Sequence, residues 1–316
     1  MLRRPVLLSS PHMRVAAILG PGCSPKTFKP FQQAAPDSEW SGSVPEAGDH
    51  CDAIILCGGD GTIHRHLEAL VNLDLPVLII PAGSGNDFAR ALGLPNLRTS
   101  LAAWQHFCKD KSNVRQVDLG VVSGIAPEAD PAPPPQPARS SRLAAPRYFA
   151  TVAGIGLSSE VTRRANALPR WLRARGGYAL GLAATVFRFA PLAMKILASG
   201  RENGWRIRSD RPTLLAAFAN TSTYGDGMKI APHARINDGE LDVCIIGGID
   251  PLKLFCMFPT VYSGRHLEIE GVDSFRAERL RIETESPLEV YADGEFVCRT
   301  PVEIGLQRAA LKIISP

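Results

Sequence analysis

The sequence predicts an α/β protein of two domains, the first with a parallel sheet and the second an antiparallel domain of β-sandwich type. Two successive strand–turn–helix units between residues 53 and 90 are typical of a parallel sheet flanked by helices. From residue 205 onward, short apolar runs separated by Gly, Asp and Asn turns are typical of antiparallel strands. A chain of 316 residues is long enough to bury both cores.

Composition and charge narrow the class of protein. With 45% hydrophobic and 21% charged residues, the chain resembles soluble globular proteins. Its net charge of +4 permits contact with an anionic membrane surface but is too small to indicate nucleic-acid binding. The seven cysteines form no Cys-x-x-Cys pair, so we expect reduced thiols in the core of a cytoplasmic protein. The apolar stretch 178–197 contains charges and a proline and predicts a helix that does not span a membrane.

The chain is organised around a glycine turn that follows the apolar strand 53–57. Gly58, Gly59 and Gly61 let the backbone turn and approach a ligand, and Thr62 opens a helix. Free N–H groups at the start of a helix form a cradle for anions. Asp60 would repel a bound phosphate there, unless a divalent cation lies between them or a substrate hydroxyl needs a base. The alternative is an ordinary turn in which Asp60 caps the helix.

A second turn of small residues follows the strand 75–80. Gly83, Ser84, Gly85 and Asn86 precede a helix, and Asp87 stands where this helix begins. Because the carboxyl ends of neighbouring parallel strands meet at one edge of the sheet, where ligands bind, we expect the two turns to lie side by side.

The other elements are predicted from their apolar patterns. In the first half of the chain we expect a strand at residues 15–19, a helix at 97–107 and a strand at 114–122. Residues 125–146 are rich in Pro and Ala and predict an exposed insertion in a hairpin. The later strands are expected at residues 148–153, 214–219, 241–246, 274–282, 288–292 and 296–298.

Taken in order, the motifs resemble those of the diacylglycerol kinase and sphingosine kinase superfamily of lipid kinases, and of its bacterial diacylglycerol kinases in particular. The resemblance covers about residues 50–300 and rests on the two glycine turns and three later motifs: Gly154-Ile155-Gly156-Leu157, Asn237-Asp238-Gly239-Glu240-Leu241-Asp242 and Asp293-Gly294-Glu295. It implies a nucleotide-binding catalytic domain of residues 1–118, to which residues 302–316 return, and a lipid-substrate domain of residues 119–301.

The resemblance implies an enzyme, a lipid kinase that uses ATP and Mg²⁺ to phosphorylate a hydroxyl of a membrane lipid. Diacylglycerol, converted to phosphatidic acid, is the first expectation, and a sphingoid base or ceramide is the next. Two alternatives stay open: a kinase for a soluble acceptor, since NAD kinase shares the Gly-Gly-Asp-Gly turn, and a non-catalytic protein that binds lipid or nucleotide. The expected partners are ATP, the acceptor lipid and an anionic membrane surface in the cytoplasm. A homodimer is left open, and no nucleic acid is expected.

The same resemblance distributes roles over the motifs. It implies Glu295 as the general base, with Asp60 as the competing candidate, and it makes Asp60 and Asp87 the candidates for Mg²⁺. Asp293 would orient its turn beside the nucleotide. The other nucleotide contacts are the remaining residues of the two turns, Gly58, Gly59, Gly61, Thr62, Gly83, Ser84, Gly85 and Asn86.

Two further sites are implied by the resemblance. A structural Mg²⁺ would be held by Asp238 and the backbone oxygens of Arg235 and Glu240, whereas a plain Asn-Asp-Gly hairpin turn would need no metal. For the lipid head group, many relatives carry an Asp at position 158 or 160. Here Ser158 leaves the first position empty, and Glu160 is the candidate for the second unless it only complements the helix dipole.

The chain departs from the family where relatives contact phosphate. The first loop lacks the usual Asn-Pro, which leaves Ser24 and Lys26 as substitutes, and His64-Arg65 replaces an Asn-Glu pair. Arg65 is a candidate for the phosphate, and we expect His64 and His66 at the surface. A basic stretch around Trp171 predicts either a membrane-interface patch or a solvated face, and its arginines are Arg163, Arg164, Arg170, Arg173 and Arg175.

Overall fold

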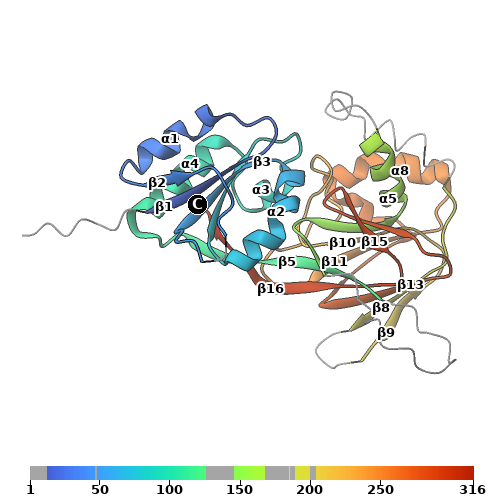
Figure 1. The fold of residues 1–316 in the computed structure, drawn as a ribbon. Helices are drawn as coiled ribbons and strands as arrows, with labels where there is room; N and C mark the ends of the chain where they lie inside the picture. The colour runs from blue at the N-terminus through green and yellow to red at the C-terminus, as the bar shows by residue number, and fades with distance from the viewer. Residues whose placement is uncertain (1–12, 47, 126–145, 168–184, 186–188, 200–203) are drawn as a thin grey trace, which may run out of the picture.

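Two lobes joined by long strands make up the protein, whose computed structural model describes residues 13–46, 48–125, 146–167, 185, 189–199 and 204–316. The strands β5 (Val114–Gly124) and β16 (Val302–Ile314) pair with each other and run from one lobe into the other (Figure 1). The strands of the described residues form a ten-stranded and a six-stranded sheet.

The first lobe is built on the parallel part of the larger sheet. Its strands pair in the order β2 (Glu39–Ser41), β1 (Arg14–Leu19), β3 (Ala53–Gly58) and β4 (Pro76–Pro81). β3 is buried along its whole length, which explains its continuous apolar run. The helices of this lobe are the short η1 (Pro25–Phe28), α1 (Lys29–Ala34), α2 (Asp60–Leu73), α3 (Asp87–Ala91) and α4 (Leu97–Asp110).

The second lobe packs the antiparallel part of the larger sheet against the six-stranded sheet. The first layer adds β6 (Arg147–Phe149), β13 (Arg279–Thr284), β8 (Met194–Ser199) and β9 (Arg206–Asp210) to β5 and β16. The six-stranded sheet has the order β12 (Val272–Ala277), β11 (Leu241–Gly247), β10 (Thr213–Ala219), β7 (Val152–Gly156), β14 (Glu289–Ala292) and β15 (Glu295–Arg299). Apolar side chains of both sheets share one core, so the predicted fold class is confirmed.

Helices cover the outer face of the six-stranded sheet. α5 (Leu157–Ala167) and α8 (Pro251–Ser263) lie there (Figure 1). The short η2 (Arg265–Glu268) follows α8 and packs Leu267 against the same core. β10 is buried throughout because its side chains alternate between two cores. Ala216 and Phe218 face the sandwich, and Leu215 and Ala217 face the helices. The sequence pattern did not predict α8.

Three predicted elements are wrong in their extent. The run 148–153 is not one strand, because the chain bends at Ala150 and Thr151 and places β6 and β7 in different sheets. The run 274–282 is not one strand, because the chain turns at Glu278 and sends β12 and β13 into different sheets. The helix predicted to reach residue 197 cannot do so, because residues 194–199 form β8, with Met194 and Ile196 alternating into the sandwich core. Residues 178–184 and 186–188 of that stretch, the basic residues from Arg170 to Arg175, and most of the Pro/Ala-rich insertion lie outside the described residues.

The expectation that all cysteines are reduced is also wrong. Cys23 and Cys57 form a disulfide, with Cα atoms 6.3 Å apart. β1 and β3 are parallel neighbours, and the loop after β1 folds back over the end of β3, where the Gly20 N–H donates to the Cys57 carbonyl oxygen at 2.7 Å. This return brings together two cysteines that are 34 residues apart. Among the described residues, every helix is too short or too polar to cross a membrane.

Candidate active site

A cleft of about 610 Å³ opens between the two lobes. The two glycine turns line one side, and β7, the loop after β10 and the β14–β15 turn line the other. The two turns lie side by side as expected, because Gly58 and Pro81 are register partners at the ends of β3 and β4. A side chain on Gly59 would collide with the backbone of Gly83, so the turns touch only because both residues are glycine.

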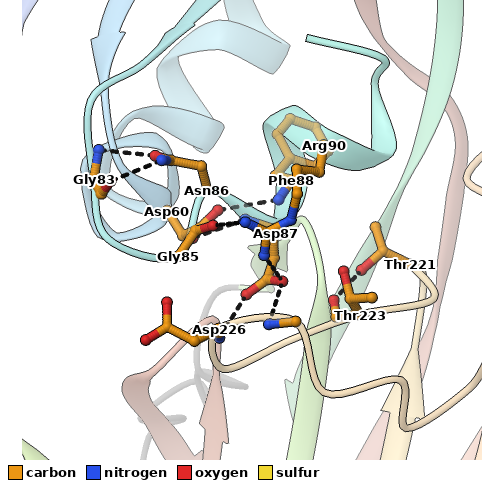
Figure 2. A network of polar contacts seen from close by, with 11 residues as sticks. Asp60, Gly83, Gly85, Asn86, Asp87, Phe88, Arg90, Thr221, Thr223 and Asp226 are labelled. Carbon is orange, nitrogen blue, oxygen red and sulfur yellow. Dashed lines mark hydrogen bonds and ion pairs between the residues drawn. The ribbon is translucent and has the colours of Figure 1, made fainter. Parts of the chain in front are cut away.

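Asp60 is the first residue of α2, but its carboxylate caps the neighbouring helix. Its two oxygens accept the backbone N–H groups of Asp87 and Phe88, each at 3.1 Å, where α3 begins (Figure 2). Burial raises the pKa of Asp60 above its ordinary value, and the charges of Asp87 and Asp293 add to this rise while the two N–H groups oppose it. A raised pKa brings a carboxyl group closer to the range in which a general base works.

The Asp87 carboxylate links the two lobes. It is 3% exposed, and its oxygens accept the backbone N–H groups of Asp226 and Gly227, each at 3.2 Å (Figure 2). These donors belong to the connection between β10 and β11, on the opposite side of the cleft. Arg90 Nη2 adds an ion pair at 2.6 Å. Asp87 therefore anchors the second lobe to the second glycine turn.

Asn86 shapes the second turn from within. Its side-chain oxygen accepts the Gly83 N–H at 2.8 Å, and its amide nitrogen donates to the Gly83 carbonyl oxygen at 2.7 Å. Its φ of 53° is the left-handed conformation that asparagine tolerates better than most residues. Gly83, Ser84 and Gly85 face the cleft, with Gly59, Gly61 and Thr62 of the first turn.

Asp293 is the buried centre of the third motif. It accepts hydrogen bonds from the Ala150 N–H at 2.7 Å, the Thr151 N–H at 2.8 Å and the Thr151 hydroxyl at 2.6 Å. His64 Nδ1 lies 3.0 Å from Asp293 Oδ2, the oxygen that also accepts the Ala150 N–H. Burial alone would raise the pKa of Asp293, but these partners, His64 first, hold it below its ordinary value. Asp293 therefore stays ionised and fixes the position of the turn that carries Glu295.

His64 is not the surface residue that the sequence suggested. It lies on the face of α2 that meets the β14–β15 turn, and its side chain is 14% exposed. Burial lowers the pKa of His64, but the hydrogen bond and charge of Asp293, with the charge of Glu295, raise it above its ordinary value. Arg147 opposes this rise. His66 Nδ1 donates along its own helix, to the Thr62 carbonyl oxygen at 2.8 Å.

The remaining predicted residues divide between the cleft and its surroundings. Glu295 is exposed, and one of its carboxylate oxygens lies 3.7 Å from where a Cβ on Gly61 would be, so it stands beside the start of α2. Arg65 and Ser158 line the cleft, whereas Lys26 does not. Glu160 pairs with Arg163 and Arg164 on its own helix, at 2.8 and 2.7 Å, and is also outside the cleft lining.

Asp226 is a cleft residue that sequence reasoning missed. It lies between two glycines in the loop after β10, with φ of 68°, and its carboxylate points away from Asp87 (Figure 2). A Cβ built on Gly85 would lie 3.0 Å from an oxygen of Asp60 and 3.4 Å from oxygens of Asp87 and Asp226. The Gly-Asp-Gly pattern, which also occurs in the first turn, was the available signal. Thr151, Tyr224 and Tyr291 also line the cleft without having been predicted.

The carboxylates around Gly85 suit a magnesium ion that arrives with a nucleotide. Within the described part of the chain, no group of three or more His, Cys, Asp or Glu residues is arranged to hold a metal alone. Mg²⁺ in phosphoryl-transfer sites needs only one or two carboxylates, because phosphate oxygens and water complete its shell. The predicted residues of the structural metal, Arg235, Asp238 and Glu240, do not line the cleft, and Asp238 and Glu240 contact Arg276.

Comparison with known families gives matches over both lobes. The model of the diacylglycerol kinase catalytic domain matches residues 30–122. The model described as the YegS C-terminal NAD kinase beta sandwich-like domain matches residues 151–315. A diacylglycerol kinase of Mycobacterium tuberculosis is 34% identical over 274 residues, which are 84% of this chain and 77% of that protein. A diacylglycerol kinase of Bacillus subtilis is 26% identical over 254 residues, 80% of this chain and 74% of that protein.

Solved structures share the arrangement of the two lobes. A crystal structure of a diacylglycerol kinase from Bacillus anthracis superposes with a TM-score of 0.64 at 20% identity, over 96% of this chain and 97% of the other. Yeast NADH kinase complexed with NADH superposes with a TM-score of 0.53 at 12% identity, over 96% and 83%. At these identities the two likenesses concern the fold alone.

Proposed function

The chain belongs to the diacylglycerol kinase family, and from that premise we propose that it transfers the γ-phosphate of ATP to the free hydroxyl of diacylglycerol, forming phosphatidic acid. The observation that carries this proposal is the meeting, across one cleft, of the two glycine turns, Asp60 and the Asp293-Gly294-Glu295 turn. Phosphoryl transfer needs a phosphate cradle, a neutralising cation and a group that orients or deprotonates the acceptor, and this cleft can supply each of them.

The phosphates of ATP would lie over the glycine turns. α2 is 14 residues long and begins at the first turn, so its unpaired N–H groups and its dipole favour an anion there. The hydroxyls of Thr62 and Ser84 can donate to phosphate oxygens, and Arg65 on the second turn of α2 adds a positive charge. Lys26 is not needed for this arrangement.

Asp60, with Asp87 and Asp226 around Gly85, would hold the Mg²⁺ that accompanies the nucleotide. Such an ion neutralises charge that develops on the phosphate oxygens during transfer. Asp87 would contribute chiefly by fixing the geometry, because its oxygens already accept the N–H groups of the opposite lobe.

Glu295 would act as the general base on the acceptor hydroxyl. Its side chain is exposed at the first position of β15, directly after the β14–β15 turn, and lies beside the start of α2. An acceptor hydroxyl bound between the lobes could therefore reach it. Asp293 and His64 hold this turn in place. Asp60 is the competing base, supported by the raised pKa of its carboxyl group, but its oxygens are committed to two backbone N–H groups.

A lipid acceptor is supported by an apolar cavity next to the cleft. This cavity lies among α5, α8 and the six-stranded sheet and shares Ser158 and Tyr224 with the cleft. Its other lining side chains are apolar, including Leu157, Met257 and Phe258. An acyl chain entering there would leave its glycerol hydroxyl in the cleft, which suggests that the protein works at the membrane surface without crossing it.

A phosphate-transfer assay tests the proposal. Radiolabelled ATP would be offered with vesicles containing diacylglycerol, ceramide or a sphingoid base, and separately with NAD as a soluble acceptor. We expect diacylglycerol to be labelled and Glu295→Gln to label it at least about a hundredfold more slowly. Glu303→Gln is the matched control, because Glu303 lies on β16 outside the cleft lining and pairs with Arg279. Labelling of NAD without lipid would contradict the proposed lipid acceptor. An unchanged rate in Glu295→Gln would contradict the role of Glu295 as the general base.

A further inference from the structure

The motif at residues 237–242 is the place where the family resemblance implies a structural Mg²⁺, and its side chains can be tested against that ion. Asp238 lies in the turn before β11, and Leu241 and Asp242 begin that strand. A magnesium ion would need free carboxylate and carbonyl oxygens about 2.1 Å from a common centre in octahedral arrangement. The three carboxylates of this motif instead pair with Arg276, and the Gly239 carbonyl oxygen accepts a hydrogen bond from Arg308.

The register between β11 and β12 places the first arginine, Arg276, at this motif. β11 and β12 are antiparallel, and Asp242 is the direct cross-strand partner of Arg276. Side chains of directly opposed residues project from the same face of a sheet, so the guanidinium group of Arg276 must lie beside the Asp242 carboxylate. The pairing of the two strands therefore places a permanent positive charge at the motif, whatever the solvent contains.

The Arg276 guanidinium group contacts all three acids of the motif. Its Nη2 atom pairs with Asp238 Oδ2 and lies 3.1 Å from Glu240 Oε2, and its Nε atom lies 3.7 Å from Asp242 Oδ2. The other Asp238 oxygen accepts the Glu240 N–H at 3.2 Å. Burial raises the pKa of Asp242, and Arg276 is the largest influence that lowers it. His233 acts in the same direction, while Asp238 and Glu240 oppose it.

A second arginine closes the other side of the turn. Arg308 of β16 donates to the Gly239 carbonyl oxygen at 3.2 Å and pairs with Glu278 at 3.0 Å. A side chain on Gly239 would overlap the Arg308 guanidinium group, so the arginine packs directly on the turn. Asp118, which is 5% exposed, accepts the Gly239 N–H at 2.9 Å and the Ala309 N–H at 2.8 Å. Side chains of the protein thus hold the turn in shape.

We propose that Arg276 takes the place of a structural divalent cation in this chain and neutralises Asp238, Glu240 and Asp242. A divalent ion at the same centre would meet a guanidinium group that already occupies the space between the three carboxylates, and two positive charges would repel each other there. The second lobe is therefore stable without metal at this motif. The planar fork of arginine suits this role, because it can donate to several carboxylate oxygens at once.

Thermal unfolding without nucleotide tests the proposal. For the wild type we expect the same midpoint in a chelator and in excess Mg²⁺. For Arg276→Gln we expect a midpoint lowered by at least about 2–4 °C in the chelator, because three carboxylates lose their counterion. Excess Mg²⁺ should restore part of that loss, since the ion can then enter the vacated centre. Arg279→Gln, which removes an exposed pair with Glu303 on the neighbouring strand, is the matched control and should change little.

Two results would overturn the inference. One is a thermal-unfolding midpoint of the wild type that rises with Mg²⁺ or falls with the chelator. Asp238→Asn must abolish this response, which shows that the metal acts at this motif. The other is an Arg276→Gln variant as stable as Arg279→Gln in the chelator. The wild-type comparison decides the matter even if Arg276→Gln does not fold. Because the readout is unfolding without ATP or lipid, neither result depends on which acceptor the enzyme uses.

Discussion

Replacing His64 with alanine should destabilise the protein in a pH-dependent way. His64 Nδ1 and Asp293 Oδ2 are 3.0 Å apart, with side-chain exposures of 14% and 1%. A hydrogen bond to a charged group contributes about 1.5–3 kcal/mol, and a neutral one contributes about 0.5–1.5 kcal/mol. Asp293 keeps its three bonds to Ala150 and Thr151 in the variant, so we expect a loss near this single-bond value.

The sign of the pH dependence follows from the two pKa directions. The pKa of His64 is raised in the folded protein, and that of Asp293 is lowered. The charged pair is therefore complete below the ordinary histidine pKa, about 6.5, and its charge is lost as pH rises through the raised folded value. The free-energy cost of His64→Ala should thus be larger by about 1 kcal/mol at low pH than at high pH. Any packing loss is common to both conditions.

Denaturant unfolding followed by tryptophan fluorescence, at one pH below and one well above these values, measures the effect. His66→Ala is the matched control, because His66 lies on the same helix and bonds only to the Thr62 carbonyl oxygen. The free-energy cost of His66→Ala should not be larger at low pH than at high pH. Equal destabilisation by His64→Ala at both pH values, or the same pH dependence in His66→Ala, would refute the charged pair.

Three further perturbations address the cleft. Asp60→Asn should lower turnover by about 10²–10⁴-fold with little loss of fold. The acid limb of the pH–rate profile should also move to lower pH, because the raised pKa of Asp60 no longer limits it. Lipid-kinase kinetics against pH measure both effects, and a near-normal rate would exclude a role for Asp60. Gly83→Ala should weaken ATP binding because a Cβ there would overlap Gly59, whereas Gly42→Ala should not, because a Cβ on Gly42 meets open space. Calorimetric titration with ATP compares the two variants, and equal affinities would contradict the close contact of the turns. Asp87→Ala should lower the free energy of unfolding by about 3 kcal/mol or more, because it leaves the N–H groups of Asp226 and Gly227 unpaired. A loss below about 1 kcal/mol in denaturant unfolding would argue against the link between the lobes.

The sequence alone determined the fold class and the family, because both are encoded by short-range pattern. Glycines at 58, 59 and 61 after an apolar strand, and at 83 and 85 after the next, specify two tight strand-to-helix turns through local backbone freedom. Parallel pairing then brings the two turns together without further information. Alternation of apolar and polar residues likewise predicted most strands of the second lobe.

The local pattern of apolar residues predicted the wrong element where strand pairing divides one continuous apolar run. The run from residue 274 to 282 reads as one strand, but β12 and β13 belong to different sheets because the chain crosses the sandwich at Glu278. Residues 194–199 belong to an apolar stretch of helical length, yet their register against β13 and β9 makes them a strand. Tertiary pairing overrode local preference at both places.

Only the tertiary structure decided which distant side chains meet. His64 and Asp293 are 229 positions apart, and Asp87 and Gly227 are 140 apart. Asp238, in the turn before β11, and Arg276, on β12, are 38 apart. Contacts of this kind depend on how two lobes close and how two strands align, and no spacing along the chain records them. The sequence therefore showed which residues could do the chemistry, and packing determined the partners that hold them in place.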